Sequence, residues 1–256
     1  MTMTAAPDAA TRGRRRPLAR IAALAVAAAL SLAACGASAS TLPPIPSSTP
    51  GESASPAASE PAPSEQAPSA NPDGCPTSQP PELPAGETRT VTIETELGAI
   101  VIGIEGALSP IAAGNFVALS ECGWYDGVVF HRLVPDFVIQ GGDGQNGREP
   151  NVDPSLVGTG GPGYTIKDEP VTAEYGRGTV AMARTSAPDS VGSQFFIVLD
   201  DQAREPLAYY NTYQIIGTVV EGMDVVDQIA AMPNSGQPSN AALDPIAMQT
   251  VTVTNP

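Results

Sequence analysis

Basic residues, histidine and cysteine are scarce in this chain, and each shortage excludes a class of function. The 256 residues include 12 Lys and Arg against 27 Asp and Glu, which gives a formal net charge of −15. A nucleic-acid binder needs a basic face, so that class is excluded. One His and three Cys are too few for most structural zinc sites. Charged and aromatic residues are also few, at 15% and 5%, whereas Gly and Pro number 25 and 27. Part of the chain is therefore not expected to fold into a packed globular domain.

The chain lacks any long apolar run except near its N-terminus. There, a basic segment with five arginines between Arg12 and Arg20 precedes a run of Ala, Leu and Val from Ile21 to Leu32. The run is too short for a stable transmembrane helix and is typical of a secretory signal. Its ending, Leu-Ala-Ala-Cys35, resembles a bacterial lipobox, in which the Cys is lipidated and becomes the new N-terminus. We predict a signal peptide over residues 1–34 and lipidation of Cys35. The alternative is an ordinary signal peptide with a chance Cys, and the export route stays open.

Residues 35–89 are rich in Pro, Ala and Ser and contain almost no large apolar side chain. Thirteen of the 27 prolines lie between residues 36 and 88. Such a segment cannot bury enough apolar surface to offset its chain entropy, and its prolines favour extended conformations. We interpret it as a disordered tether that holds a domain, residues 90–256, away from a membrane. The alternative is a proline-rich ligand for a partner domain with an aromatic groove. Without residues 1–34 the formal net charge is −19, which repels anionic lipids and nucleic acid.

From about Thr90 the pattern changes to short strands. Apolar residues alternate with polar ones on both sides of Leu97-Gly98, which predicts a hairpin. Six more apolar or β-branched runs follow, at residues 128–134, 137–140, 178–183, 194–199, 214–220 and 247–254. Eight short strands separated by glycine-rich loops are typical of an antiparallel barrel or sandwich.

Two segments are predicted to be helices. Ser109-Pro110 is an N-cap followed by Pro at the first helical position, and Gly123 ends that helix. The second helix runs from about Met223 to Met232, with Pro233 beyond it. No strand–helix–strand alternation is present, which excludes a doubly wound α/β fold.

Three stretches of the domain carry a specific resemblance. They are Phe-His-Arg-Leu-Val-Pro-Asp-Phe-Val-Ile-Gln-Gly-Gly-Asp at 130–143, Gly-Thr-Gly-Gly-Pro-Gly-Tyr at 158–164, and Gly-Thr-Val-Ala-Met-Ala-Arg at 178–184 with Gly-Ser-Gln-Phe-Phe-Ile at 192–197. Together they resemble the cyclophilin family of peptidyl-prolyl cis/trans isomerases over residues 90–254. The resemblance implies an all-β-dominated fold, an eight-stranded antiparallel barrel closed by two helices, with the substrate groove on its outer face. The strand and helix count made from the residues alone agrees with this.

The chemistry of proline isomerisation explains which residue types such a site needs. Rotation about an Xaa–Pro bond has a barrier of about 20 kcal/mol, because amide resonance must be broken. No bond is cleaved and no proton leaves, so we expect no nucleophile, metal or cofactor. The site needs an apolar pocket for the proline ring and a donor aimed at the prolyl nitrogen, which gains a lone pair as resonance is lost. A donor that acts only in the transition state raises the rate.

The resemblance assigns a role to each candidate site residue. Arg132 is the catalytic donor, and Gln140 orients it. The remaining substrate-binding residues are His131, Phe137, Val138, Ala183, Arg184, Gln194, Phe196, Leu207 and Tyr213. The alternatives are a surface salt-bridge role for the arginine and a barrel-core role for the apolar residues. We interpret His131 as structural support near the groove, and a Ser–His hydrolase is disfavoured because no nucleophile elbow is present.

The chain departs from the family pattern at several of these positions. The family usually has Asn where Arg184 stands and more often Met where Val138 stands. The loop at 185–191 differs in length and composition, and the spacing of Leu207 is off. These departures put the peptide preference in doubt.

Asp143-Gly-Gln-Asn-Gly147 is the one sequence in the domain that hints at a calcium loop. The fifth position is Gly, and no Glu closes a twelve-residue loop. We interpret it as an acidic surface loop and predict no metal.

Cys75 and Cys122 are the cysteines left once Cys35 carries lipid. Leftover thiols commonly pair in an oxidising compartment, so we predict a Cys75–Cys122 disulfide that pins the end of the tether to the barrel. The alternative is two independent thiols, with Cys122 a small buried residue at the end of a helix.

The function expected from the sequence is a monomeric, lipid-anchored extracytoplasmic isomerase. Its partners would be proline-containing peptides and unfolded exported proteins at the outer face of the cytoplasmic membrane, which it would contact only through the anchor. One alternative is a non-catalytic proline-peptide-binding or chaperone module, and another is a mainly structural lipoprotein. Arg184 and the altered 185–191 loop favour the module. Five retained residues favour the enzyme: Arg132, Phe137, Gln140, Gln194 and Phe196.

Overall fold

The computed structural model describes residue 72 and residues 74–255. The predicted signal peptide, Cys35 and most of the predicted tether lie outside the described residues. Within the described part, no helix combines the length and the apolar character that crossing a membrane requires.

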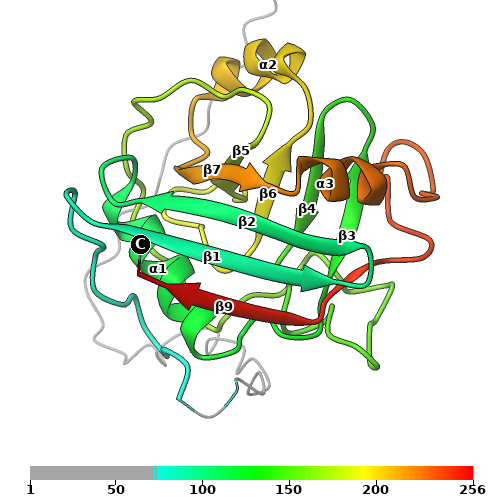
Figure 1. The fold of residues 1–256 in the computed structure, drawn as a ribbon, viewed down its shortest axis with the longest axis horizontal. Helices are drawn as coiled ribbons and strands as arrows, with labels where there is room; N and C mark the ends of the chain where they lie inside the picture. Colours follow the sequence, from blue (N-terminus) through cyan, green and yellow to red (C-terminus); the bar gives the residue numbers. More distant parts are fainter. Residues whose placement is uncertain (1–71, 73, 256) are drawn as a thin grey trace, which may run out of the picture. The chain divides into compact units, whose positions relative to one another are not determined.

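Nine strands form one antiparallel sheet in the order β8-β3-β4-β6-β5-β7-β2-β1-β9 (Figure 1). The strands are β1 Thr88–Thr95, β2 Gly98–Glu105, β3 Val128–Val134, β4 Val138–Gly141, β5 Thr179–Met182, β6 Phe195–Val198, β7 Ile215–Glu221, β8 Ala247–Met248 and β9 Thr250–Thr254. Each of the eight predicted strands is present. The ninth arises because Gln249 interrupts the last one.

The last segment of the chain brings the two edges of the sheet together. β8 pairs with β3, whereas β9, one residue later, pairs with β1. Because β3 and β1 are otherwise at opposite ends of the strand order, this pairing makes a nearly closed barrel. The predicted fold class is therefore confirmed, with a small difference in strand count.

Strands β5 and β6 are buried on both faces, which is why their sequences are almost entirely apolar, whereas β4 carries the half-buried Gln140 among buried neighbours. Side chains alternate between the two faces of a strand. In β6, Phe195 and Ile197 belong to the barrel interior, whereas Phe196 and Val198 belong to a second apolar cluster. This second cluster lies on the outer face of the sheet and positions the candidate site.

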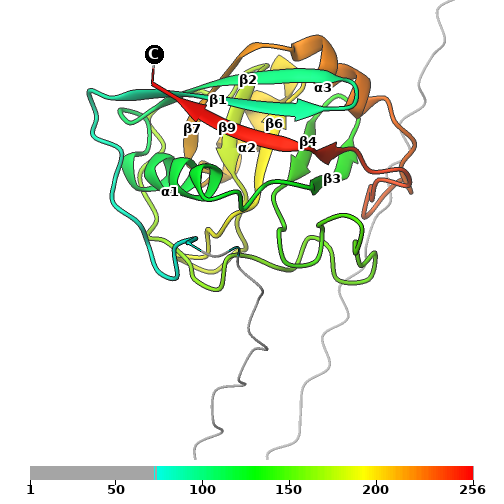
Figure 2. The ribbon, with the colours of Figure 1, turned by 60° about the horizontal axis from the view of Figure 1, so that its bottom comes forward.

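Helices α1 (Pro110–Glu121) and α3 (Met223–Ala230) match the two predicted helices. They lie at opposite ends of the sheet in both views (Figures 1 and 2). Each contributes to the interior cluster, for example through Phe116 from α1 and Ile229 from α3. The two helices therefore close the barrel by burying apolar side chains at its ends.

The sequence analysis missed a short helical segment between β6 and β7. It consists of the 3-10 turn η1 (Asp201–Ala203) followed by α2 (Arg204–Tyr210). Asp200 caps the turn, since its carboxylate accepts the Gln202 N–H, and Asn211 ends α2 in the left-handed conformation. Leu207 is the one buried residue of α2, so the apolar periodicity that reveals a helix is absent.

The start of α1 is capped by a distant residue and not by Ser109. Ser109 occupies the N-cap position, but its hydroxyl has no hydrogen-bond partner within the described residues. Instead, the Glu169 carboxylate accepts the N–H groups of Ile111 and Ala112, each at 2.9 Å. A carboxylate at a helix N-terminus also interacts favourably with the helix dipole. The loop that carries Glu169 is thereby fixed to α1.

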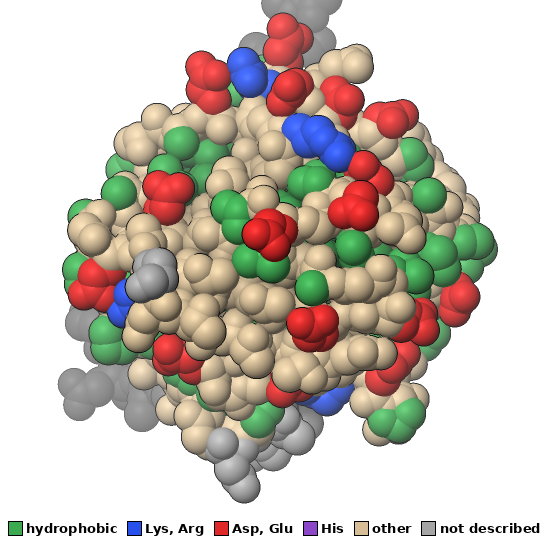
Figure 3. Space-filling view, in the orientation of Figure 1, with side chains coloured by type: hydrophobic (Ala, Val, Ile, Leu, Met, Phe, Trp, Pro, Cys, Tyr) green, Lys and Arg blue, Asp and Glu red, His purple; other side chains and the backbone are tan. Residues whose placement is uncertain are grey.

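Acidic side chains dominate the visible charge on the domain surface. Figure 3 shows Asp and Glu scattered over one face, with few Lys or Arg between them. This distribution agrees with the excess of acidic residues in the sequence.

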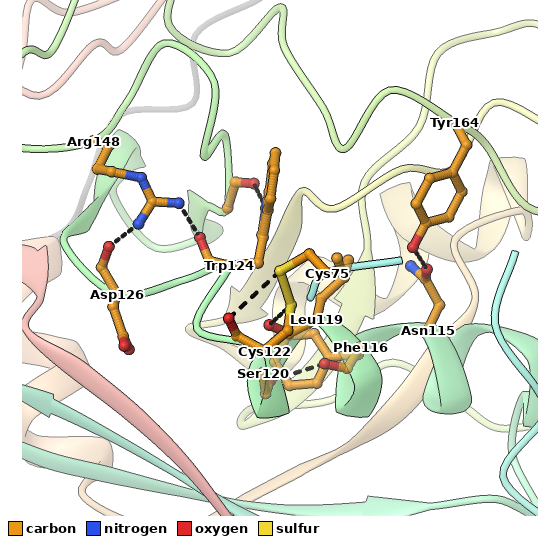
Figure 4. Close-up of a disulfide and its surroundings, with 11 residues drawn as sticks. Cys75, Asn115, Phe116, Leu119, Ser120, Cys122, Trp124, Asp126, Arg148 and Tyr164 are labelled. Carbon is orange, nitrogen blue, oxygen red and sulfur yellow. Dashed lines mark hydrogen bonds between the residues drawn. A yellow bond between two sulfur atoms is a disulfide. The ribbon is translucent and has the colours of Figure 1, made fainter. Parts of the chain in front are cut away.

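Residues 74–87 belong to the folded domain, although the tether was predicted to extend to residue 89. A disulfide joins Cys75 to Cys122 at the end of α1, with Cα atoms 5.1 Å apart (Figure 4). Leu83 is buried, and its N–H donates to the Pro110 carbonyl at 3.0 Å. A Cβ on Gly114 would lie 2.2 Å from the Pro81 oxygen, so only glycine permits this approach. The domain therefore begins about residue 74, earlier than the predicted boundary.

Candidate active site

A bulge in β3 positions Arg132. Phe130 pairs with Gly141 and Arg132 with Gln140, so one extra residue, His131, lies between these pairs on β3. The bulge places Arg132 directly opposite Gln140 on β4. Arg132 is half-buried, and burial lowers the pKa of its guanidinium while the nearby Tyr213 phenol opposes that shift. An arginine remains charged at neutral pH in such a setting.

A chain of side-chain amides runs from Arg132 to a glycine-rich loop. Arg132 Nη1 donates to Gln140 Oε1 at 3.3 Å, and Gln140 Nε2 donates to Gln194 Oε1 at 3.0 Å. Gln194 Nε2 in turn donates to the carbonyls of Gly158 and Gly160, both at 2.9 Å. Each amide is satisfied on both sides, which fixes its orientation. The structure thus brings together the three polar residues that the resemblance singled out.

Beside this chain lies the outer apolar cluster. All five predicted pocket residues, together with Ala183, belong to it or pack against it: Phe137, Val138, Phe196, Leu207, Tyr213 and Ala183. The rings of Phe196 and Tyr213 meet edge to face with centroids 5.4 Å apart. Leu207 reaches the cluster from α2 and is 4% exposed. Its spacing in the sequence departs from the family pattern, but α2, the helix that the sequence analysis missed, brings it to the cluster.

Tyr175 is a supporting residue of this cluster that sequence reasoning missed. It is fully buried, its hydroxyl donates to the Tyr213 carbonyl at 2.9 Å, and it accepts the Tyr213 N–H at 3.2 Å. Burial raises the pKa of Tyr175 to about 12, so the hydroxyl stays a donor. Nothing in the sequence near Tyr175 indicates this role, because its partner lies 38 residues away.

A cavity of about 880 Å³ opens next to Gln140 and Gln194. The glycine-rich loop forms one wall, and Ala183, Arg184 and Thr185 contribute to another. The Ala183 N–H donates to the Gln194 carbonyl at 2.8 Å. The amide of Ala183 is therefore committed to the protein, and a main-chain contact with a peptide there would fall to its carbonyl oxygen.

The Arg184 guanidinium is turned into its own loop. Its side chain is 8% exposed, forms an ion pair with Asp168 at 2.9 Å, and donates to the Ala187 carbonyl at 2.7 Å. Asp168 and Asp189 also bond reciprocally, each N–H to the other's carboxylate. Arg184 thus stabilises the 185–191 loop, and its charge is paired with Asp168 and does not face the groove as an unpaired cation.

His131 is buried beneath the glycine-rich loop. It is 7% exposed, and within the described residues neither ring nitrogen makes a well-formed hydrogen bond, apart from a weak backbone contact with Val129. A Cβ on Gly158 would lie 3.3 Å from Nε2, so the ring packs directly against this loop. Burial lowers the pKa of His131 from 6.5 to about 4, and Asp143 opposes the shift. The imidazole is therefore neutral near pH 7 and supports the loop by packing.

We expect His131 to make the domain less stable in mild acid. The unfolded chain takes up a proton near pH 6.5, whereas the folded protein resists protonation down to about pH 4. Stability is therefore full above pH 6.5 and falls as the pH drops towards 4, by about 2 kcal/mol between pH 7 and pH 5. Urea unfolding at both pH values measures this loss. A His131→Gln variant should lose much less over this interval, and an equal loss in both proteins would contradict the assignment.

The Asp143 segment is not the acidic surface loop that the sequence predicted. Asp143 is fully buried, and its carboxylate accepts several backbone N–H groups. Within residues 74–255, no group of three or more His, Cys, Asp or Glu side chains could hold a metal ion. The prediction failed because two of the donors, Gly158 and Gly160, lie 15 and 17 residues away and are brought to Asp143 only by the fold.

Comparisons with known proteins agree with this geometry. A family profile described as "Cyclophilin type peptidyl-prolyl cis-trans isomerase/CLD" matches residues 90–253. The chain is 40% identical over 167 residues to a peptidyl-prolyl cis-trans isomerase of Acinetobacter baylyi, covering 64% of this chain and 84% of that one. It is 33% identical over 184 residues to peptidyl-prolyl cis-trans isomerase A of Dickeya dadantii, covering 69% and 90% of the two chains.

A solved structure is also similar. It is a cyclophilin-type peptidyl-prolyl cis-trans isomerase of Cryptosporidium parvum, crystallised in the presence of the dipeptide Ala-Pro. The TM-score is 0.53 at 28% identity, and the match covers 65% of this chain and 99% of that chain. One and the same family is indicated by the nearly closed antiparallel barrel, by the family profile and by the relatives. This chain belongs to the cyclophilin family of peptidyl-prolyl cis-trans isomerases.

Proposed function

We propose that the isomerase acts on proline-containing segments through Arg132, with the proline ring held in the outer apolar cluster. The observation that carries this proposal is a charged donor beside an apolar pocket. Gln140 engages Arg132 Nη1, and within residues 74–255 the guanidinium has no other hydrogen-bond or ion-pair partner. Its remaining N–H groups are therefore free to donate to a substrate. The Ala-Pro dipeptide used with the Cryptosporidium parvum relative supports a proline-containing ligand for this groove.

The proposed mechanism separates binding from acceleration. Phe137, Val138 and Phe196 bind the proline ring equally in the ground and transition states, which lowers KM. Arg132 donates to the prolyl nitrogen, whose lone pair appears only as resonance is lost, and this raises kcat. Gln140 orients the guanidinium for that donation. No proton leaves the substrate at any step.

We further propose that the enzyme assists the folding of exported proteins at the outer face of the cytoplasmic membrane. The Cys75–Cys122 disulfide supports this location, because disulfides persist in oxidising compartments and are rare in the cytosol. Protease treatment of intact cells, combined with alkylation of free thiols, tests it. The domain should be degraded from outside and should yield no alkylated Cys75 or Cys122. Protection from protease together with two alkylated thiols would refute the location.

We predict that Cys35 carries the lipid and that residues 1–34 are absent from the mature protein. The Leu-Ala-Ala-Cys ending after a basic segment and a short apolar run motivates this prediction. Mass spectrometry of the membrane fraction should find diacylglyceryl on an N-terminal Cys35. A Cys35→Ala variant should leave the membrane fraction. A mature chain that starts elsewhere and carries no lipid would be incompatible with the anchor.

The alternative of a non-catalytic binding module has lost much of its support. It rested on Arg184 and the altered 185–191 loop, both of which depart from the family pattern. Because the Arg184 guanidinium is tied to Asp168 and to loop carbonyls, the substitution does not obstruct the groove with a free charge. The enzyme therefore remains the better account of the site.

A further inference from the structure

Asp143 is a buried carboxylate that the mechanism above does not use. It follows β4 and is 0% exposed. Its Oδ1 accepts the N–H groups of Gln145 and Asn146, at 3.1 and 2.9 Å. Its Oδ2 accepts the N–H groups of Gly158 and Gly160, at 2.8 and 2.9 Å. Burying a charge costs free energy unless hydrogen bonds compensate it, and here four backbone donors do so.

Gly158 and Gly160 link this carboxylate to the catalytic amides. Each glycine donates its N–H to Asp143 and accepts Gln194 Nε2 with its carbonyl, the latter at 2.9 Å in both cases. The same two residues thus connect Asp143, through their N–H groups, to Gln194, through their carbonyls. From Gln194 the contacts continue to Gln140 and then to Arg132.

The loop needs such an anchor because its composition makes it flexible. Glycines lose more conformational freedom on folding than other residues, and four of the six residues from 158 to 163 are glycine. The glycines also make the contact feasible, since a Cβ on Gly160 would lie 2.4 Å from Asp143 Oδ1. His131 packs on the same loop at Gly158 but makes no hydrogen bond to it.

We propose that Asp143 is a positioning residue for catalysis, acting through the Gly158–Gly160 loop and Gln194 to orient Gln140 and Arg132. The proposal rests on the proposed role of Arg132. Asp143 is expected to affect the rate of isomerisation and not the binding of substrate, because none of its contacts reaches the outer apolar cluster. A change at Asp143 should therefore alter kcat and leave KM nearly unchanged.

The test is a double-mutant cycle with Asp143→Asn and Gln194→Ala. Asparagine keeps the shape but replaces one acceptor oxygen by an NH2 group, which faces two backbone N–H donors. In the full mature chain, Asp143→Asn should lower kcat about tenfold and change KM less than twofold. In a Gln194→Ala background the same substitution should change kcat less than twofold, because the hydrogen bonds that link the glycine-rich loop to Gln140 through Gln194 are already absent. Asp153→Asn is the matched control, since Asp153 also accepts a backbone N–H but is only partly buried.

Three results would overturn the proposal: wild-type kcat in Asp143→Asn, an effect confined to KM, or the same tenfold loss in both backgrounds. If Asp143→Asn does not fold, Gly160→Ala takes its place, with Gly86→Ala as control because a Cβ on Gly86 meets nothing within 4 Å. Gly160→Ala should show the same kcat loss, and wild-type kcat there would refute the proposal. Arg132→Ala in the same series separates the two claims. Full activity in Arg132→Ala refutes the proposed function itself, whereas its loss alongside additive Asp143 and Gln194 effects refutes only the positioning role.

Discussion

Replacing Arg132 with alanine should lower kcat for proline isomerisation by two or more orders of magnitude while leaving the fold intact. Removing one well-placed transition-state donor costs about 2.7–4 kcal/mol in comparable sites. The fold should survive because Arg132 is half-buried, its side chain bonds Gln140 alone among the described residues, and Gln140 keeps its bond to Gln194. Steady-state kinetics with a proline peptide, together with the thermal unfolding midpoint, measure both parts of the prediction.

Two further variants sharpen this prediction. Arg132→Lys should also lose most of the activity, because an ammonium cannot bond Gln140 and the substrate with the planar geometry of a guanidinium. Arg89→Ala is the control: Arg89 lies on β1 and pairs with Glu87 at 2.6 Å, away from the described site. Turnover near the wild-type value in Arg132→Ala would remove Arg132 from the mechanism.

Loss of the Cys75–Cys122 disulfide should lower the free energy of unfolding by about 4 kcal/mol. The two cysteines are 47 residues apart, and closing a loop of that length limits the entropy of the unfolded chain by this amount in the chain-entropy model. The bond also holds residues 75–87 against α1, where Leu83 is buried. Urea unfolding of a Cys75→Ser/Cys122→Ser variant, compared with the oxidised wild type, measures the difference.

The activity of this variant provides the control. The disulfide lies at the end of α1, near Trp124 and Arg148 (Figure 4), and neither cysteine belongs to the outer apolar cluster. The folded variant should therefore keep a wild-type kcat at a temperature well below its unfolding midpoint. Unfolding free energies within about 1 kcal/mol of each other, with the disulfide intact in the wild-type protein, would contradict the predicted stabilisation.

The strands could be predicted from the sequence because burial imposes a simple pattern on them. Period-two alternation in β1 and β2 reflects one buried face, and the almost entirely apolar sequences of β5 and β6 reflect two. α2 escaped prediction because it exposes Tyr209 and Tyr210 and buries only Leu207. The residue pattern of a strand with a buried face can thus be recognised in the sequence, whereas a short, mostly exposed helix such as α2 leaves no such pattern.

The folded segment at 74–87 was mistaken for tether because its composition resembles the tether. It is held by the disulfide, which the sequence analysis predicted, and by the close approach of its backbone to Gly114, which leaves no local pattern. Asp143 and Glu169 escaped for the same reason. Asp143 accepts N–H groups of Gly158 and Gly160, and Glu169 accepts those of Ile111 and Ala112, across separations of 15 to 58 residues. Such contacts appear only once the fold brings the partners together.

The most direct test of the whole account is the rate at which the mature wild-type chain interconverts the cis and trans forms of a proline peptide. Exchange NMR on a peptide with one Xaa–Pro bond measures this rate without a coupling protease. Uncatalysed interconversion takes tens to hundreds of seconds at 25 °C. The account predicts exchange at least a hundredfold faster with catalytic amounts of wild-type protein and near-uncatalysed exchange with Arg132→Ala. An uncatalysed rate in the presence of folded wild-type protein would contradict it.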